Sequence, residues 1–344
     1  MKRLLLPVLS AAGALFLAAC STVSPSAPAD AGGSPARAPL PPIASRPAIA
    51  DAWKDAIVLE TPFAQAVVVP SLGRVVYFAG RDGENIYRCE PSLVGQKPSS
   101  SAAGDTFFNI GGDWLWPVAQ AHWHSFPGRD GNWPPPKALR DAGWKVSATN
   151  GAITLTRNYG KPVNAKATRT FFLAPDAENG TAALVIDQTL TRTKESTIPL
   201  VLWHVSQIAS PDAVLLPLAA ESALPGRFVQ LDGPPPAEGR LSATETDVIY
   251  RLAEDGEIKL GSDAGEGAGA VAAARGGGKV LVSAVVASAR GFPASAAYPD
   301  GGCSHEAYVN CGLGYAEIET LSREVLLPPG ETVSNRLVIR LDVP

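Results

Sequence analysis

The sequence predicts an all-β protein built as a large antiparallel β-sandwich, and three observations support this. The chain has 344 residues, 46% hydrophobic and 18% charged, so it can bury a substantial core. Its 33 Gly and 31 Pro make up almost a fifth of the residues, which favours short strands joined by turns over a helical bundle. From about residue 51 onward, β-branched or alternating runs recur with few helical signals between them.

The strand candidates share alternating or β-branched sequence bounded by turn residues. They are residues 66–78, 152–157, 167–173, 181–191, 198–208, 279–287, 313–321 and 333–341. The run PDAENG at residues 175–180 predicts a hairpin closed by Asn-Gly. The Gly/Ala-rich residues 260–278 predict a surface loop with one short strand, and residues 137–142 give a short helical signal.

The N-terminus has the pattern of a bacterial lipoprotein signal. Lys2 and Arg3 precede an apolar stretch at residues 4–18, and LAAC ends it at Cys20, the residue that such signals acylate. An ordinary signal peptide or a short membrane anchor is the alternative, although the apolar run is short for a bilayer span. Ser21 after the cysteine resembles the outer-membrane sorting pattern, so we expect an outer-membrane lipoprotein facing the periplasm or the surface.

Three regions follow from this reading. Residues 1–19 form the signal, residues 20–50 a linker anchored through Cys20, and residues 51–344 the sandwich domain. Residues 21–50 contain seven Pro, eight Ala and five Ser with no aromatic residue, so they cannot bury enough surface to fold. The formal charge of -4, without a long basic run, argues against a nucleic-acid binder.

The cysteines are odd in number once Cys20 is acylated. Cys303 and Cys311 are eight residues apart, and we expect them to form a disulfide in an oxidising periplasm, with two unpaired thiols as the alternative. Cys89 has no nearby base in the sequence, so a catalytic role is not expected.

The most unusual stretch is residues 109–144, which is rich in Trp, Pro, Gly, His and Asp. It holds five of the seven tryptophans: Trp114, Trp116, Trp123, Trp133 and Trp144. Aromatic faces beside polar groups suit sugars, whose C–H faces stack on rings while their hydroxyls meet polar side chains. A loop that packs its own aromatic residues over the sandwich is the alternative.

The histidines in this stretch are separated by one residue. His122 and His124 would share a face in an extended segment, and a metal site with Asp113 or His305 is imaginable. No specific ligand spacing is present, so we expect histidines that contact solvent or substrate, with no metal or other cofactor.

Two further strands carry ionisable residues. His204 lies in an apolar run where alternation places it with Leu200, Leu202 and Ser206, and a satisfied core histidine is the alternative to a functional one. Glu317 and Glu319 share a strand face, and two carboxylates in a dry core would have raised pKa values. That face therefore meets a cleft, a cation or plain solvent.

In the order of its motifs the sequence resembles the galactose mutarotase-like superfamily, especially bacterial lipoprotein members without an assigned activity. The matching segments are residues 69–78, 83–86, 111–117 with Gln120, 133–136, 170–190, 198–207, 298–302, 308–310, 315–319 and 327–330. The resemblance covers about residues 55–344 and implies a β-supersandwich of the galactose mutarotase type with an open sugar cleft.

In active members a histidine protonates the ring oxygen while a glutamate takes the proton of the anomeric hydroxyl. By position, the resemblance implies His204 as the acid and Glu317 or Glu319 as the base. It also implies Arg74 and Asn85 as substrate contacts. The further candidates for sugar binding are Asp113, Trp114, Trp116, Gln120, His122 and Trp133.

We therefore expect a monomeric, membrane-tethered lipoprotein that binds carbohydrate. The expectation depends on His204 and the acidic pair meeting in one hollow beside the Trp-rich stretch. An active aldose 1-epimerase and a non-catalytic structural protein of the envelope are the alternatives. A polysaccharide lyase is more distant, because no Arg/Lys/Tyr cluster is evident.

Overall fold

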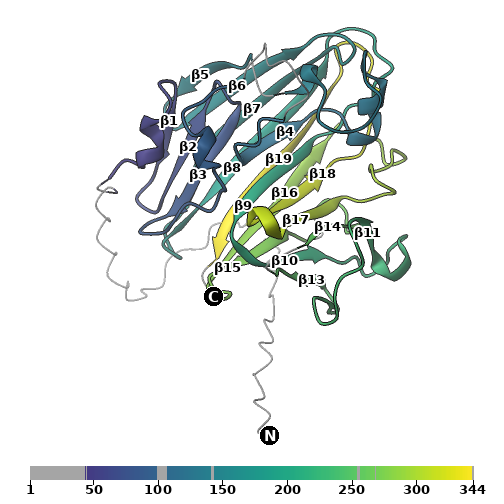
Figure 1. The fold of residues 1–344 in the computed structure, drawn as a ribbon. Helices are drawn as coiled ribbons and strands as arrows, with labels where there is room; N and C mark the ends of the chain where they lie inside the picture. Colours follow the sequence, from purple (N-terminus) through teal and green to yellow (C-terminus); the bar gives the residue numbers. More distant parts are fainter. Residues whose placement is uncertain are drawn as a thin grey trace, which may run out of the picture. The chain divides into compact units, whose positions relative to one another are not determined.

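Two antiparallel sheets pack face to face (Figure 1). The computed structural model describes residues 43, 45–98, 107–140, 143–253, 256–267 and 269–342, and within these the sheets have nine and ten strands. The prediction of an all-β antiparallel sandwich is confirmed. All described residues belong to one compact unit.

The nine-stranded sheet carries the residues of most interest below. In spatial order its strands are β1 (Ile57–Glu60), β2 (Ala64–Val69), β3 (Arg74–Gly80), β4 (Gly112–Trp116), β9 (Trp203–Ala209), β18 (Tyr315–Leu321), β17 (His305–Asn310), β14 (Glu257–Ser262) and β11 (Phe228–Asp232). One face of this sheet packs on the other sheet, and we call the opposite one its outer face.

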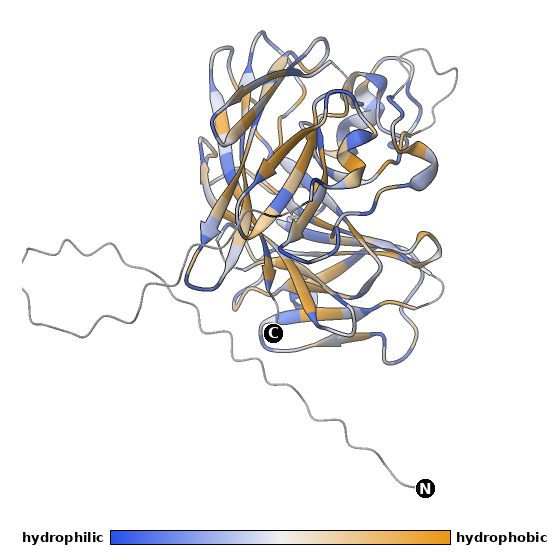
Figure 2. Ribbon diagram, turned by 90° about the vertical axis from the view of Figure 1, so that its left-hand side faces the viewer, coloured by the Kyte–Doolittle hydropathy of each residue, from blue (hydrophilic) through white to orange (hydrophobic). Residues whose placement is uncertain are grey.

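The ten-stranded sheet closes the other side of the core. Its strands are, in order, β12 (Leu241–Ala243), β13 (Asp247–Arg251), β10 (Pro211–Pro217), β15 (Val271–Arg275), β16 (Val280–Arg290), β19 (Thr332–Asp342), β8 (Thr181–Arg192), β7 (Ala165–Asp176), β6 (Ala152–Tyr159) and β5 (Lys145–Thr149). Figure 2 shows apolar stretches concentrated in the strands, as burial between two sheets requires.

The helical elements in the described residues are single short 3-10 turns. They are η1 (Ala48–Asp51), η2 (Pro91–Leu93), η3 (Gln120–Ser125), η4 (Lys137–Leu139), η5 (Pro225–Arg227) and η6 (Cys311–Leu313). None of them is long and apolar enough to cross a membrane. The signal predicted for residues 1–19 lies outside the described residues, as does most of the linker, although Ala50 at its end is buried beside Trp53.

A layer of polar side chains divides the core between the sheets. It consists of Asp113, His204 and Ser206 from the nine-stranded sheet and Arg169, Gln188 and Asn335 from the other. Arg169 Nε donates to Gln188 Oε1 at 3.1 Å, and Gln188 Nε2 donates to Asn335 Oδ1 at 3.1 Å. Apolar residues fill the core on both sides of this polar layer. Because its members bond to one another, most of their buried polar groups have partners, and His204 Nδ1 is the exception in the layer among the described residues.

The strongly patterned strands lie where the sequence predicts them. The hairpin closed by residues 177–180 joins β7 to β8, as predicted. Residues 66–78 form a hairpin of two strands instead of one strand, because the turn before β3 interrupts the run. Residues 260–278 contain the end of β14, in the nine-stranded sheet, and all of β15, in the ten-stranded sheet. The predicted short strand is therefore present, but the segment contributes to both sheets instead of forming mainly a surface loop.

Candidate functional site

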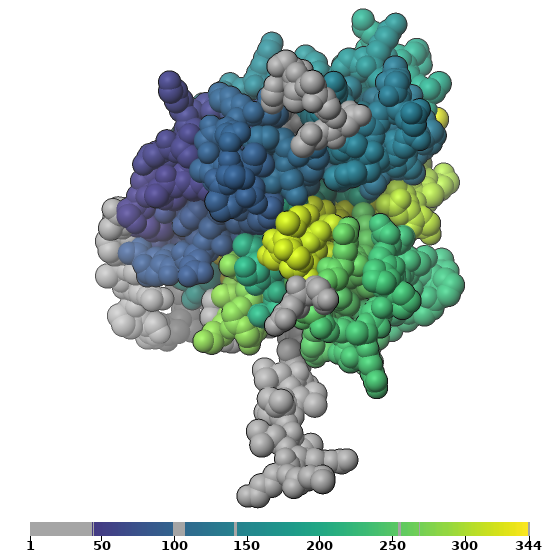
Figure 3. Space-filling model, viewed as in Figure 1, coloured from purple at the N-terminus to yellow at the C-terminus, as the bar shows by residue number. Residues whose placement is uncertain are grey.

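A cleft of about 380 Å³ lies on the outer face of the nine-stranded sheet. We call it the outer cleft. Its lining residues are Phe107, Asn109, Trp116, Gln120, Trp133, Asp232, Glu257, Lys259, Tyr308, Tyr315, Glu317 and Glu319. In Figure 3 the blue and teal segments that include residues 107–140 lie above the green segments that include residues 228–262, with yellow-green C-terminal residues between them. The cleft therefore joins segments that are far apart in the sequence.

Strand alternation places the polar lining. In β18, Tyr315, Glu317 and Glu319 point outward, because Ala316 and Ile318 face the core. The register of β18 on β17 sets Glu317 opposite Tyr308, and β17 on β14 sets Tyr308 opposite Lys259. Three neighbouring strands thus present one patch of ionisable groups.

Rings form one side of the cleft, and we call Phe107, Trp116 and Trp133 the aromatic wall. Trp116 is buried edge-on between Trp123, at 4.9 Å between centroids, and Trp203, at 5.5 Å. Trp133 is 56% exposed and lies 5.4 Å from the Phe107 ring. A rigid wall with one open indole is suited to stack on a flat apolar ligand face.

Lys259 holds the carboxylates at the other side. Its ammonium lies 2.6 Å from Glu306 Oε2 and 3.4 Å from Glu319 Oε2, and it stands 4.7 Å from the centre of the Trp203 ring. Trp203 Nε1 donates to the same Glu319 oxygen at 2.6 Å. Burial lowers the pKa of Lys259, but Glu306 and Glu319 outweigh it and the net pKa is raised. Lys259 therefore stays charged and holds Glu319 in a fixed place.

Glu317 is the proton-holding carboxyl of the cleft. Burial, and then the nearby charge of Glu319, raise the pKa of Glu317 to about 8. Gln207 Nε2 donates to its Oε1 at 2.7 Å, and this bond with the charges of Lys259 and Arg74 opposes the rise. Near neutral pH, Glu317 can thus donate a proton. Burial also raises the pKa of Glu319, with Lys259 and Trp203 opposing the rise.

His204 does not reach the outer cleft, so the expectation that it meets the acidic pair in one hollow is wrong. Its neighbours Trp203 and Gln207 contact the outer carboxylates, while His204 points into the core with no exposed surface. There Nε2 of His204 bonds Asp113, which also accepts from Arg169 and, at 2.9 Å, from Ser206 Oγ. Burial raises the pKa of Asp113, but the charges of His204 and Arg169 outweigh it and lower the pKa overall. His204 is therefore a core histidine, the alternative that the sequence left open, although only its Nε2 has a hydrogen-bond partner among the described residues and Nδ1 has none.

The comparisons with known proteins rest on structure alone. No protein-family profile and no curated protein sequence matches the chain. Among solved structures, a galactose mutarotase related enzyme from Lactobacillus acidophilus aligns with a TM-score of 0.54 and 9% identity over 83% of this chain and 97% of its own. A galactose mutarotase-like protein from Lactobacillus casei aligns with a TM-score of 0.50 and 11% identity over 83% and 100%. A protein from Synechocystis sp. PCC 6803 reaches 0.56 with 12% identity over 84% and 96%.

The fold is galactose mutarotase-like. The similarity spans nearly the whole length of each of these proteins, so the likeness is to the complete sandwich. At 9–12% identity this likeness concerns the fold alone.

Within this mutarotase-like fold, five of the predicted site residues line the outer cleft: Trp116, Gln120, Trp133, Glu317 and Glu319. The Trp-rich stretch divides between its two interpretations, because Trp114 and Trp123 are buried as packing while Trp116 and Trp133 line the cleft. Trp144 packs elsewhere, against Gly73, where a Cβ would lie 2.0 Å from the indole nitrogen.

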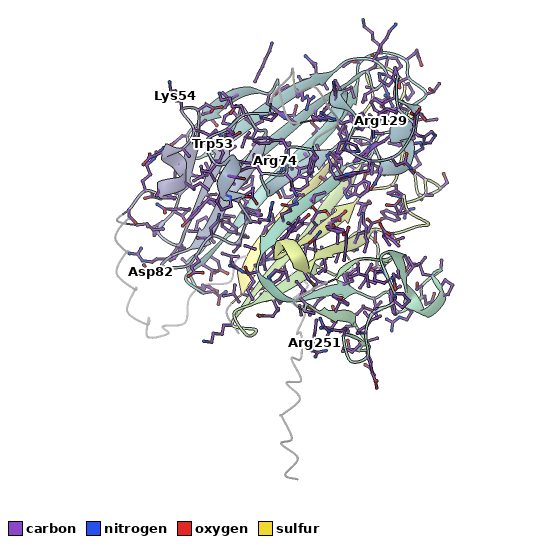
Figure 4. All side chains as sticks on the ribbon, viewed as in Figure 1. Trp53, Lys54, Arg74, Asp82, Arg129 and Arg251 are labelled. Atoms are coloured by element: carbon purple, nitrogen blue, oxygen red, sulfur yellow. The ribbon has the colours of Figure 1, made fainter. Side chains whose placement is uncertain are left out.

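Four other residues predicted to contact the ligand do not line the outer cleft and instead contact other parts of the protein. Arg74, labelled in Figure 4, is buried. Its guanidinium lies 4.1 Å from the Trp114 ring centre, and its Nη1 donates to Gly111 O at 2.7 Å. Asn85 bonds the backbone of its own turn, accepting from Phe78 N at 3.1 Å. His122 Nε2 lies 2.8 Å from Glu324 Oε1. Asp113 belongs to the polar layer, so the interpretation of these four residues as cleft contacts is not supported by their positions.

The predicted disulfide between Cys303 and Cys311 is wrong. Both cysteines are free and buried, and all six residues of β17 lie between them. An extended run of that length spans ~20 Å, whereas a disulfide needs Cα atoms within ~7 Å. Cys89 is free as well, and burial raises its pKa to about 12, so its thiol is not an activated nucleophile.

The sequence interpretation missed several lining residues, chiefly Lys259, Tyr308 and Tyr315. The alternation EIKL at residues 257–260 was the available signal for Lys259, since it places Glu257 and Lys259 on one strand face. Alternation in the sequence does place Tyr315 on the same strand face as Glu317. That Tyr315 lines the cleft, however, depends on residues of neighbouring strands.

A second hollow, of about 660 Å³, lies among turns at strand ends, where Arg275, Asp212 and Glu84 meet. None of the predicted site residues lines it. In the part of the chain that the structure describes, no group of three or more His, Cys, Asp or Glu residues is arranged to hold a metal ion. The outer cleft is therefore the stronger candidate for function.

Proposed function

We propose that this protein binds carbohydrate in the outer cleft. The observation that carries the proposal is the placement of the exposed Trp133 ring in the same cleft as Glu317 and Glu319. A sugar ring has apolar C–H faces that stack on indoles and hydroxyls that bond carboxyl and amide groups. The volume of about 380 Å³ is at the lower end of the range for small-ligand sites, so a ligand of one or two rings fits best.

Calorimetric titration with a panel of neutral aldoses and short glycans tests the proposal. We expect binding that Trp133→Ala weakens about tenfold, since stacking on an aromatic ring contributes ~1 kcal/mol or more. Leu326→Ala is the matched control, because it removes another exposed apolar side chain, 60% exposed, that does not line the cleft. If no sugar in the panel binds, the proposal fails.

Interconversion of anomers is the second candidate, and the raised pKa of Glu317 favours it. The reaction needs one group to take the proton of the anomeric hydroxyl and another to protonate the ring oxygen, so that the C1–O5 bond opens and recloses on either face. With His204 buried on the other side of the sheet, Glu317 is the group that can donate and Glu319 the group that can accept. Their backbone positions are ~7 Å apart, which leaves room for both to reach one sugar ring.

Polarimetry distinguishes binding from catalysis. An enzyme accelerates the rotation change of a freshly dissolved aldose, and Glu317→Gln and Glu319→Gln each remove the acceleration. His204→Gln, a core substitution, serves as the contrast: catalysis that depends on the imidazole itself, in a variant that remains folded, would refute the assignment of the two carboxyls.

We also propose that the domain is tethered to the outer membrane through an acylated Cys20. The support is the sequence pattern of a charged start, an apolar run and LAAC. Mass spectrometry of the N-terminal peptide from membrane fractions, with Cys20→Ser as the comparison, tests the anchor. A non-catalytic structural role in the envelope is the outcome if the anchor is found and no sugar binds.

A further inference from the structure

The charges of the outer cleft are unbalanced toward the acidic side. Asp232, Glu257, Glu317 and Glu319 line it, and Lys259 is the one cation in the described lining. The charge of Lys259 is already engaged, because its ammonium lies between Glu306 and Glu319. A ligand therefore meets carboxyl groups that its own charge must complement.

The nearest arginines do not reverse this balance. Arg74 is fully buried against the Trp114 ring, and Arg88 pairs with Glu90 at 2.8 Å and stacks on Tyr315 at 4.8 Å. A phosphate or carboxylate on the ligand would need a free guanidinium or ammonium as partner. The described lining offers none, and its ionised carboxylates would repel such a ligand.

A positively charged group, in contrast, finds two kinds of partner. Gln207 occupies Oε1 of Glu317, so Oε2 is the oxygen that a ligand would meet. An ammonium beside Oε2 favours the ionised form of Glu317, which then releases the proton that it holds in the empty cleft. The open indole of Trp133 in the same lining can contribute a cation–π contact.

From this arrangement we infer that the sugar bound in the outer cleft is an amino sugar with a free ammonium group, held between the aromatic wall and Glu317. The inference rests on the proposed carbohydrate function and adds the class of sugar to it. It excludes uronic acids and sugar phosphates as preferred ligands.

A matched series of ligands on one ring tests the inference. Glucosamine, N-acetylglucosamine, glucose and glucuronate are titrated calorimetrically at pH 6.5 and low salt, and the galactose series is titrated in the same way. We expect the dissociation constant of the free amine to be at least tenfold below that of the parent hexose, with the uronate weakest. The preference should shrink in 0.5 M salt, because screening weakens the pairing of charges.

Variants identify the carboxyl responsible. Glu317→Gln should reduce the preference for amine over hexose to less than threefold, measured as a ratio so that any general loss of binding cancels. Glu178→Gln, in an exposed turn remote from the cleft, should leave the ratio as it is. Asp232→Asn, on the exposed rim, gives a second reading if Glu317→Gln does not fold, and should lower the ratio in part.

The outcomes separate the inference from the proposed function. Equal binding of hexosamine, N-acetylhexosamine and hexose overturns the inference and leaves the carbohydrate function standing. Preferred binding of the uronate also overturns it. Ethanolamine binding as tightly as the hexosamine overturns it too, because the ring would then contribute nothing. If no sugar of either series binds, the carbohydrate function itself fails.

Discussion

Replacing Glu317 with Gln should change how stability depends on pH. The folded protein holds the Glu317 proton with a pKa of about 8, whereas an unfolded chain releases it near the ordinary value of 4.5. Folding therefore favours the protonated form, and the stability that this proton contributes is complete below pH ~4.5 and is lost as the pH rises through about 8. Gln cannot ionise, so the variant does not undergo this loss.

The size of the effect follows from the two pKa values. At 1.36 kcal/mol per pKa unit, the interval from 4.5 to about 8 sets a ceiling of ~5 kcal/mol on the free energy of unfolding. Relative to wild type, we expect Glu317→Gln to be neutral or slightly destabilising at pH 5 and stabilising by ~2–5 kcal/mol at pH 9. Because Glu317 and Glu319 interact, the difference between the variant and wild type reports Glu317 together with its interaction with Glu319.

Urea denaturation followed by tryptophan fluorescence, at pH 5, 7 and 9, measures these differences. Glu178→Gln is the control for removing a surface carboxylate, and we expect its difference from wild type to be the same at each pH. A Glu317→Gln variant whose difference from wild type does not change between pH 5 and pH 9 would show that Glu317 is ionised at neutral pH. The role of Glu317 as a proton donor would then be refuted.

Three further predictions concern the core, the aromatic wall and the cysteines. Asp113→Ala should destabilise the protein by ~3–5 kcal/mol in urea denaturation, because it leaves the buried Arg169 guanidinium without its counter-charge; a loss below 1 kcal/mol contradicts the pairing. Trp133→Ala should change the free energy of unfolding by less than ~0.5 kcal/mol while weakening sugar binding, since its ring is largely exposed; a large loss of stability would show that the ring is packing. Thiol titration of the denatured, unreduced domain should detect three free cysteines, Cys89, Cys303 and Cys311. Detection of a single thiol would instead show that two of the three are joined in a disulfide.

The sequence predicted the strands well where the alternation of apolar and polar residues was clear within a single strand. β7, β8 and β19 are long alternating runs whose inward residues are apolar, and their predicted positions agree with the structure to within a few residues. β15 lies in Gly/Ala-rich sequence, where small side chains give little periodic contrast, so the one short strand predicted within residues 260–278 had no exact position. Its strand character comes from pairing with β10 and β16, which a single sequence does not display.

The candidate site was predicted in part for a similar reason. Alternation correctly grouped Glu317 with Glu319 and His204 with Ser206, because residues two apart share a strand face. It could not tell which of the two faces was buried. That choice depends on Asp113, which lies 91 residues before His204 and bonds it, and on Arg169 of the opposite sheet, which bonds Asp113. The resemblance assigned His204 by position in the chain, and the packing of the two sheets decided otherwise.

The polar layer also constrains how β9 can align with its neighbours. A slip of one residue would turn His204 and Ser206 toward the ligand side and carry the Trp203 indole and the Gln207 amide between the sheets. Asp113 would then lose its bonds to His204 and Ser206 in a dry interior, a cost that purely aliphatic neighbours would not impose. The polar layer between the sheets thus disfavours misaligned pairings of β9. In this way, side chains that do not line the outer cleft fix the spacing of the groups on β9 and β18 that face it.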